Sequence, residues 1–115
     1  MIRYLLPLAL LSVPAAAQDA SPQLSLEQRM LLRCSAAFAI VAEGQANGNT
    51  QALQYPPMAD RGREFFVRAS ARVMDEAGLD RAAVSAALAT EARDISEDGT
   101  LEQVMPPCLA LLPPA

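Results

Sequence analysis

The sequence contains no histidine, no lysine and no tryptophan. Without histidine the chain cannot form a Ser-His-Asp triad or a Cys-His pair, and without lysine it cannot form a Ser-Lys dyad or a Schiff base. Zinc and copper sites usually take imidazole or thiolate ligands, which are absent here or expected to be oxidised. The sequence therefore predicts no catalytic residue, no metal site and no cofactor. A carboxylate-based hydrolase is the least favoured alternative.

Positive charge is also scarce. Nine arginines stand against thirteen carboxylates, which gives a formal net charge of −4 at neutral pH. Nucleic acids and anionic lipid surfaces are bound by clustered cations, so this balance disfavours both as partners. No haem-attachment, phosphate-loop or dinucleotide-binding motif is present. These absences favour a non-catalytic protein that acts by binding.

Residues 1–17 have the pattern of a signal peptide. Arg3 precedes an apolar segment from residue 5 to residue 13, and Ala15 and Ala17 give the small-residue pattern that a signal peptidase recognises. The apolar run is about ten residues, half of the roughly 20 that span a bilayer. We therefore expect cleavage before Gln18, no stable membrane insertion after cleavage, and a periplasmic or secreted protein.

The two cysteines, Cys34 and Cys108, are expected to form one disulfide, as is usual for an exported chain. Chain entropy predicts roughly 4–5 kcal/mol of stabilisation for closing a loop of this length. A redox-active pair is one alternative, because Cys34 follows Arg33 and Cys108 follows two prolines at an expected helix start. Intermolecular bonding is the other alternative.

Apolar periodicity predicts a single helical domain over residues 25–112, after a mobile lead at residues 18–24. The first helix begins with a capping box at residues 25–28 and ends around Gly44 to Gly48. Residues 50–55 allow a helical turn. The second helix covers residues 58–77, with Pro57 at its first position and Gly78 as its stop.

A third helix is expected over residues 81–95, capped by Asp80, with positions 84, 88, 92 and 95 facing inward. The last segment begins with a second capping box at Thr100 and carries Pro106 and Pro107, which predict a kink or two short helices. No run of β-branched residues alternates with period two. The predicted fold is therefore all-α: a small four-helix bundle closed by one disulfide and preceded by a cleaved signal peptide.

The second helix carries both an apolar stripe and a row of arginines. The stripe consists of Met58, Gly62, Phe65, Phe66, Ala69 and Val73. Gly62 lies on this stripe at a cost of about 1 kcal/mol in helix propensity relative to alanine. Close approach of another helix, with the first helix as the candidate, is the favoured explanation. A ligand slot beside the glycine is the alternative.

A candidate partner surface consists of Tyr55, Arg61, Arg68 and Arg72. The three arginines fall on one helical face, and Tyr55 precedes them beside a rigid pair of prolines. We expect this surface to bind an anionic or protein partner. Two structural interpretations stay open: ion pairs with residues 64, 75 and 76 neutralise the arginines, and Tyr55 covers the core.

Three segments resemble a group of small exported helical proteins of alphaproteobacteria, of sphingomonad type: RCSAAFA (33–39), YPPMADRGREFFVRAS (55–70) and PPCLALL (106–112). The resemblance implies export and the Cys34–Cys108 pairing, and it implies no catalytic role. In build alone, the chain is similar to periplasmic acid-stress chaperones, which are also small, helical and closed by one disulfide. The leading prediction is an exported, non-catalytic binding protein, and the main alternative is an acid- or envelope-stress chaperone that loosens below about pH 4.

Overall fold

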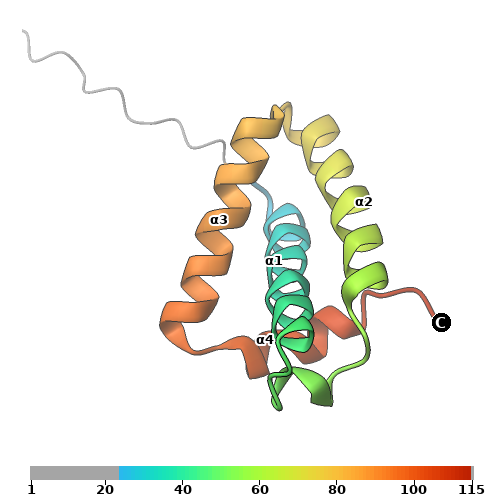
Figure 1. Ribbon diagram of the computed structural model, residues 1–115. Coiled ribbons are helices and arrows are strands. Elements are labelled where there is room, and N and C mark those ends of the chain that lie inside the picture. The colour runs from blue at the N-terminus through green and yellow to red at the C-terminus, as the bar shows by residue number, and fades with distance from the viewer. Residues whose placement is uncertain (1–23, 115) are drawn as a thin grey trace, which may run out of the picture.

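The computed structural model describes residues 24–114 and contains four helices in that range (Figure 1). They are α1 (Leu26–Ala46), α2 (Ala59–Ala77), α3 (Arg81–Asp98) and α4 (Leu101–Leu109), with a short 3-10 turn η1 (Ala52–Gln54) between α1 and α2. The described residues include no strand, so the predicted all-α class is confirmed. The expected signal peptide, with Ala15, Ala17 and Gln18 at its cleavage site, lies outside the described residues, as does the lead up to residue 23.

Helix α1 runs through the middle of the fold. Helices α2 and α3 pack on either side of it and meet at the turn through Gly78, while the short α4 lies across the opposite end (Figure 1). We call the end that holds α4 and η1 the base of the bundle. Helix α4, the last in the sequence, therefore lies at the base, whereas the start of α1 lies at the other end of the bundle, near the turn through Gly78.

Local sequence signals set both ends of α1. The predicted capping box is present, because the Gln28 amide donates to Ser25 Oγ at 3.1 Å and the Ser25 amide donates to Gln28 Oε1 at 2.9 Å. The helix ends at Ala46 with Asn47 as its cap, inside the predicted region from Gly44 to Gly48. A Cβ at Gly44 would lie 2.7 Å from the Cβ of Ala52, so this glycine lets η1 pack against α1.

The ends of α2 and α3 also follow from single residues. Helix α2 begins at Ala59, so Pro57 precedes the cap residue instead of taking the first helical position. Gly78 ends α2 with a φ of 67°, in the left-handed region that favours glycine. The Asp80 side chain accepts from the Ala83 amide at 2.8 Å and caps α3, which continues three residues beyond the predicted end at Ile95.

The prediction for the last segment is wrong in three respects. Thr100 makes no side-chain cap, and its hydroxyl is buried without a hydrogen-bond partner. The two short helices do not form, because Pro106 and Pro107 lie inside one continuous helix, and Cys108 lies in the last turn of that helix instead of at its start. The prolines remove the donors to the carbonyls of residues 102 and 103. These four residues are exposed, so water can bind the carbonyls.

The core consists of two apolar clusters. The larger lies toward the base, where the rings of Phe38 and Phe65 meet edge to face with their centroids 5.1 Å apart. The smaller one is centred on three buried residues from α1, α2 and α3: Leu32, Val73 and Val84. The predicted stripe of α2 is buried except for Phe66, which is 41% exposed because it follows Phe65 on the helix and therefore points about 100° away from it.

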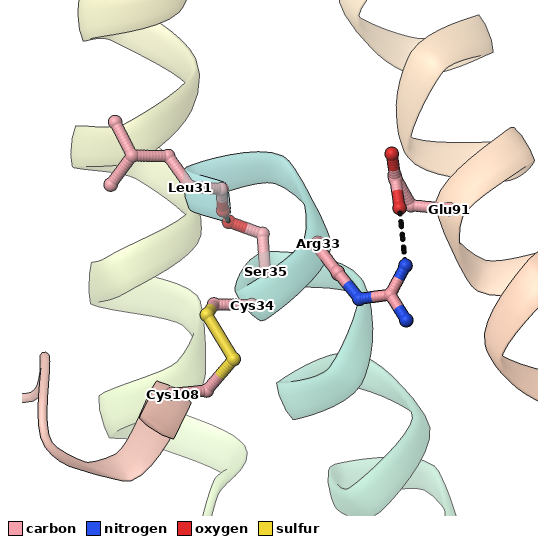
Figure 2. The surroundings of a disulfide bond; sticks show 6 residues. All are labelled: Leu31, Arg33, Cys34, Ser35, Glu91 and Cys108. Atoms are coloured by element: carbon pink, nitrogen blue, oxygen red, sulfur yellow. Dashed lines mark hydrogen bonds and ion pairs between the residues drawn. A yellow bond between two sulfur atoms is a disulfide. The ribbon is translucent and has the colours of Figure 1, made fainter. Parts of the chain in front are cut away.

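The predicted disulfide between Cys34 and Cys108 is confirmed (Figure 2). It joins the middle of α1 to α4 across a sequence separation of 74 residues, with the two Cα atoms 5.2 Å apart. Neither cysteine has exposed surface, and neither is free to form an intermolecular bond. The bond therefore acts as a buried link that holds α4 on the base of the bundle.

Candidate functional site

A hollow of about 690 Å³ lies at the base of the bundle. It is bounded by the end of α1, the segment around η1, the end of α3 and the start of α4. Its apolar wall includes Ile40, Tyr55, Ile95 and Leu101, and its polar lining includes Asn49, Gln51, Gln54, Ser96 and Glu102. We call it the base hollow. Its volume lies within the range of about 300–1,000 Å³ that is usual for small-molecule sites.

One glutamine organises the segment that forms a wall of the base hollow. Gln45 Nε2 donates to the carbonyls of Ala52 at 3.0 Å, Tyr55 at 3.1 Å and Pro56 at 2.9 Å. Gln45 Oε1 accepts from the Met58 amide at 2.9 Å. A single side chain from the last turn of α1 therefore fixes the chain from η1 to the start of α2. No sequence motif marked Gln45 for this role.

Two further contacts hold the same segment. Asn49 Oδ1 accepts from the Ala52 amide at 3.0 Å, at the start of η1. Tyr55 is half-buried, packs against the larger core cluster and also lines the base hollow. Tyr55 thus covers part of the core, as one interpretation of the sequence proposed, and is also one of the residues that line the hollow.

The arginines lie elsewhere. Arg72 pairs with Glu27 at 2.6 Å and with Glu76 at 2.9 Å. Hydrogen bonds to Glu76 and then Glu27 raise the pKa of Arg72, and the hydrogen bonds from Arg72 and then Gln28 lower the pKa of Glu76. Arg61 Nη2 donates to the carbonyl of Pro113 at 2.7 Å. Two of the three arginines therefore already contact groups of this chain.

Arg68 is exposed and lines a shallow depression of about 160 Å³ together with Arg72 and Pro113. The three ion pairs in the described residues do not include the expected contact between Arg68 and Glu64. The side of α2 that bears the arginines faces the C-terminal segment. Tyr55 lines the base hollow, which shares no lining residue with this depression. The four predicted partner residues thus fall at two separate places.

Gly62 has the role predicted for it. A Cβ at this position would lie 3.2 Å from the Cβ of Phe38, so the glycine allows α2 to approach α1 closely. The alternative of a ligand slot is not removed by this finding, since an apolar groove of about 370 Å³ runs beside the glycine. Ala42 and the exposed Phe66 also line the groove.

A partly buried ion pair links α1 to α3 near the disulfide. Arg33 Nη1 lies 3.4 Å from Glu91 Oε2, and Glu91 is only 8% exposed (Figure 2). Sequence reasoning missed this pair because 58 residues separate its two members. The contact positions the middle of α3 against α1. Both residues precede, along their helices, the residues that line the base hollow.

Within residues 24–114 no group of three or more acidic, histidine or cysteine side chains is placed to hold a metal ion. None of the helices described is long and apolar enough to cross a bilayer. The chain matches no family model, no curated protein and no solved structure. The resemblance to exported alphaproteobacterial proteins therefore stays a prediction.

Proposed function

We propose that this chain is an exported, non-catalytic binding protein whose ligand site is the base hollow. The observation that carries the proposal is a hollow of about 690 Å³ with an apolar wall and several polar lining residues. Small-molecule sites usually combine an apolar lining with a few placed polar groups. The four hydrogen-bond contacts of the Gln45 side chain support the proposal, because they order one wall before any ligand arrives.

Export is part of the same proposal. A closed disulfide between Cys34 and Cys108 supports it, because disulfides persist in oxidising compartments and are rare in reducing ones. The signal-peptide pattern of residues 1–17 gives the second support. We place the protein in the periplasm or outside the cell.

A matched pair of tryptophan variants tests the site. Ser96 and Ser85 are both exposed serines of α3, but only Ser96 lines the base hollow. Small aromatic and aliphatic fragments are screened by saturation-transfer NMR against the wild type, Ser96→Trp and Ser85→Trp. We expect fragments that bind the wild type and Ser85→Trp but not Ser96→Trp. Absence of binding, or equal binding to all three proteins, would contradict the proposal.

One observation favours an acid-stress chaperone as a second candidate. Each ion pair in the described residues depends on a carboxylate: Arg33 with Glu91, and Arg72 with Glu27 and Glu76. Two of them, Arg33 with Glu91 and Arg72 with Glu27, join α1 to a neighbouring helix, and they would be lost on protonation, with exposure of apolar surface. The candidate predicts that the oxidised protein suppresses aggregation of an unfolding enzyme at pH 3 and not at pH 7. Equal behaviour at the two pH values would exclude it.

The proposed anionic or protein partner of the arginine side is a separate hypothesis, and it rests on Arg68. Arg68 is exposed and is not a member of the three ion pairs of the described residues, so its charge is available to a partner. In a cross-linked pull-down from a cell-envelope extract, Arg68→Ala should lose a stoichiometric partner that the wild type retains. Recovery of the same proteins by both would refute this hypothesis.

A further inference from the structure

We infer that the base hollow selects a small amphipathic amine, with an ammonium group on an apolar body, over the neutral or anionic analogue. The inference rests on the proposed ligand site and concerns the charge of its ligand. Of the described residues that line the hollow, Glu102 alone carries a charge, and no lining residue is a cation. A carboxylate in the lining of a hollow that has no lining cation attracts a cation and repels an anion.

The helix ends around the hollow contribute the same sign. Helices α1 and α3 both end at its wall, through Gly44 from the last turn of α1 and through Ser96 and Gly99 at the end of α3. The C-terminal end of a helix carries a partial negative charge, which basic residues in the last turn usually compensate. Neither last turn contains a basic residue. Two helix ends whose last turns lack a basic residue therefore lie at the hollow.

The start of α4 opposes this effect only in part. Its positive end reaches the hollow at Leu101, but the helix has nine residues and carries Glu102 in its first turn. Ile40, Ile95 and Leu101 supply the apolar contribution to the walls, and the aromatic residue Tyr55 lines the same hollow. Aromatic rings also attract cations electrostatically. An amine on an apolar body satisfies both the wall and the charge.

Three naphthyl compounds of nearly equal size separate the contribution of the ligand's charge from that of its apolar body: 1-naphthylmethylamine, 1-naphthalenemethanol and 1-naphthoate. Their dissociation constants are measured by fluorescence anisotropy with the full chain, at pH 7 and about 20 mM ionic strength, where screening is weak. We expect the amine to bind about two- to fivefold more tightly than the alcohol, the range that an exposed charge pair supplies, and the carboxylate to bind most weakly. Glu102→Gln should remove most of the advantage of the amine.

Glu97→Gln is the matched control, because Glu97 is an exposed residue of α3 that follows Ser96 but does not line the hollow. This variant should keep the preference for the amine. If the alcohol or the carboxylate binds the wild type as tightly as the amine, the inference is wrong while the ligand site stands. If no compound binds, or if Ser96→Trp binds all three as the wild type does, the proposed site fails as well.

Discussion

Replacing Gln45, in the last turn of α1, with alanine should destabilise the protein more than an alanine substitution in the irregular segment that its side chain holds. The Gln45 amide group supplies two N–H donors, shared among the carbonyls of Ala52, Tyr55 and Pro56, and one oxygen that accepts from the Met58 amide. Three hydrogen bonds at about 1 kcal/mol each give a loss of about 3 kcal/mol in the free energy of unfolding. Met58 has no exposed surface, so its amide would be left without a partner.

Thermal unfolding of the oxidised protein, followed by far-UV circular dichroism, measures this loss. For a domain of this size about 3 kcal/mol lowers Tm by about 12–24 °C. Gln45→Glu is a second variant, because it keeps the shape and the acceptor but turns an oxygen toward the three carbonyls. At pH 7 it should be at least as destabilising as the alanine.

Gln54→Ala is the control for the same segment. Gln54 is exposed in η1, so its loss should change the stability by less than about 0.5 kcal/mol. If the free energy of unfolding of Gln45→Ala also lies within about 0.5 kcal/mol of the wild-type value, the Gln45 contacts do not hold the wall of the base hollow. The role assigned to this residue would then be refuted.

Three other changes test the rest of the fold. Replacing both Cys34 and Cys108 with alanine should lower the free energy of unfolding by about 4 kcal/mol, because the disulfide closes a long loop. Urea unfolding measures this loss, and an unchanged midpoint would contradict the prediction. Gly44→Val should lower the free energy of unfolding by about 2 kcal/mol, because a Cβ at this position would lie 2.7 Å from the Cβ of Ala52 in η1. A rise in Tm would contradict the close packing of η1 on α1. Hydrogen bonds, first from Arg72, lower the pKa of Glu76, so this carboxylate stabilises the fold above its ordinary value of 4.5 and the effect is lost as pH falls through the lowered pKa. Glu76→Gln should therefore lower Tm at pH 7 and leave it unchanged at pH 2, and an equal difference at both would contradict the assignment.

Much of the secondary structure could be predicted because its signals are local. Ser25 with Gln28, Asp80 and Gly78 each act within a few residues of the helix end that they set. The pairing of the two cysteines followed from their number. The same local rules failed in α4, where the extended capping geometry expected at Thr100 does not form and two exposed prolines are accommodated inside one helix.

The site was less predictable, because its parts come from four separate elements. Tyr55 was identified from its neighbouring prolines, but its companions Asn49, Ser96 and Glu102 carry no shared motif. Their juxtaposition depends on how α3 and α4 turn across the base. Gln45 was missed for a similar reason, since a glutamine in a last helical turn usually faces solvent. Tertiary contacts alone give these residues a common role.

Amide chemical-shift mapping of the full chain during titration with 1-naphthylmethylamine tests the ligand site most directly. The account predicts saturable shifts at Ala52, Ser96 and Leu101, which line the base hollow. The amides of Gly62 and Phe66, beside the apolar groove between α1 and α2, should stay unchanged. Saturable shifts confined to Gly62 and Phe66, or no saturable shift at the base, would contradict the assignment of the base hollow as the binding site.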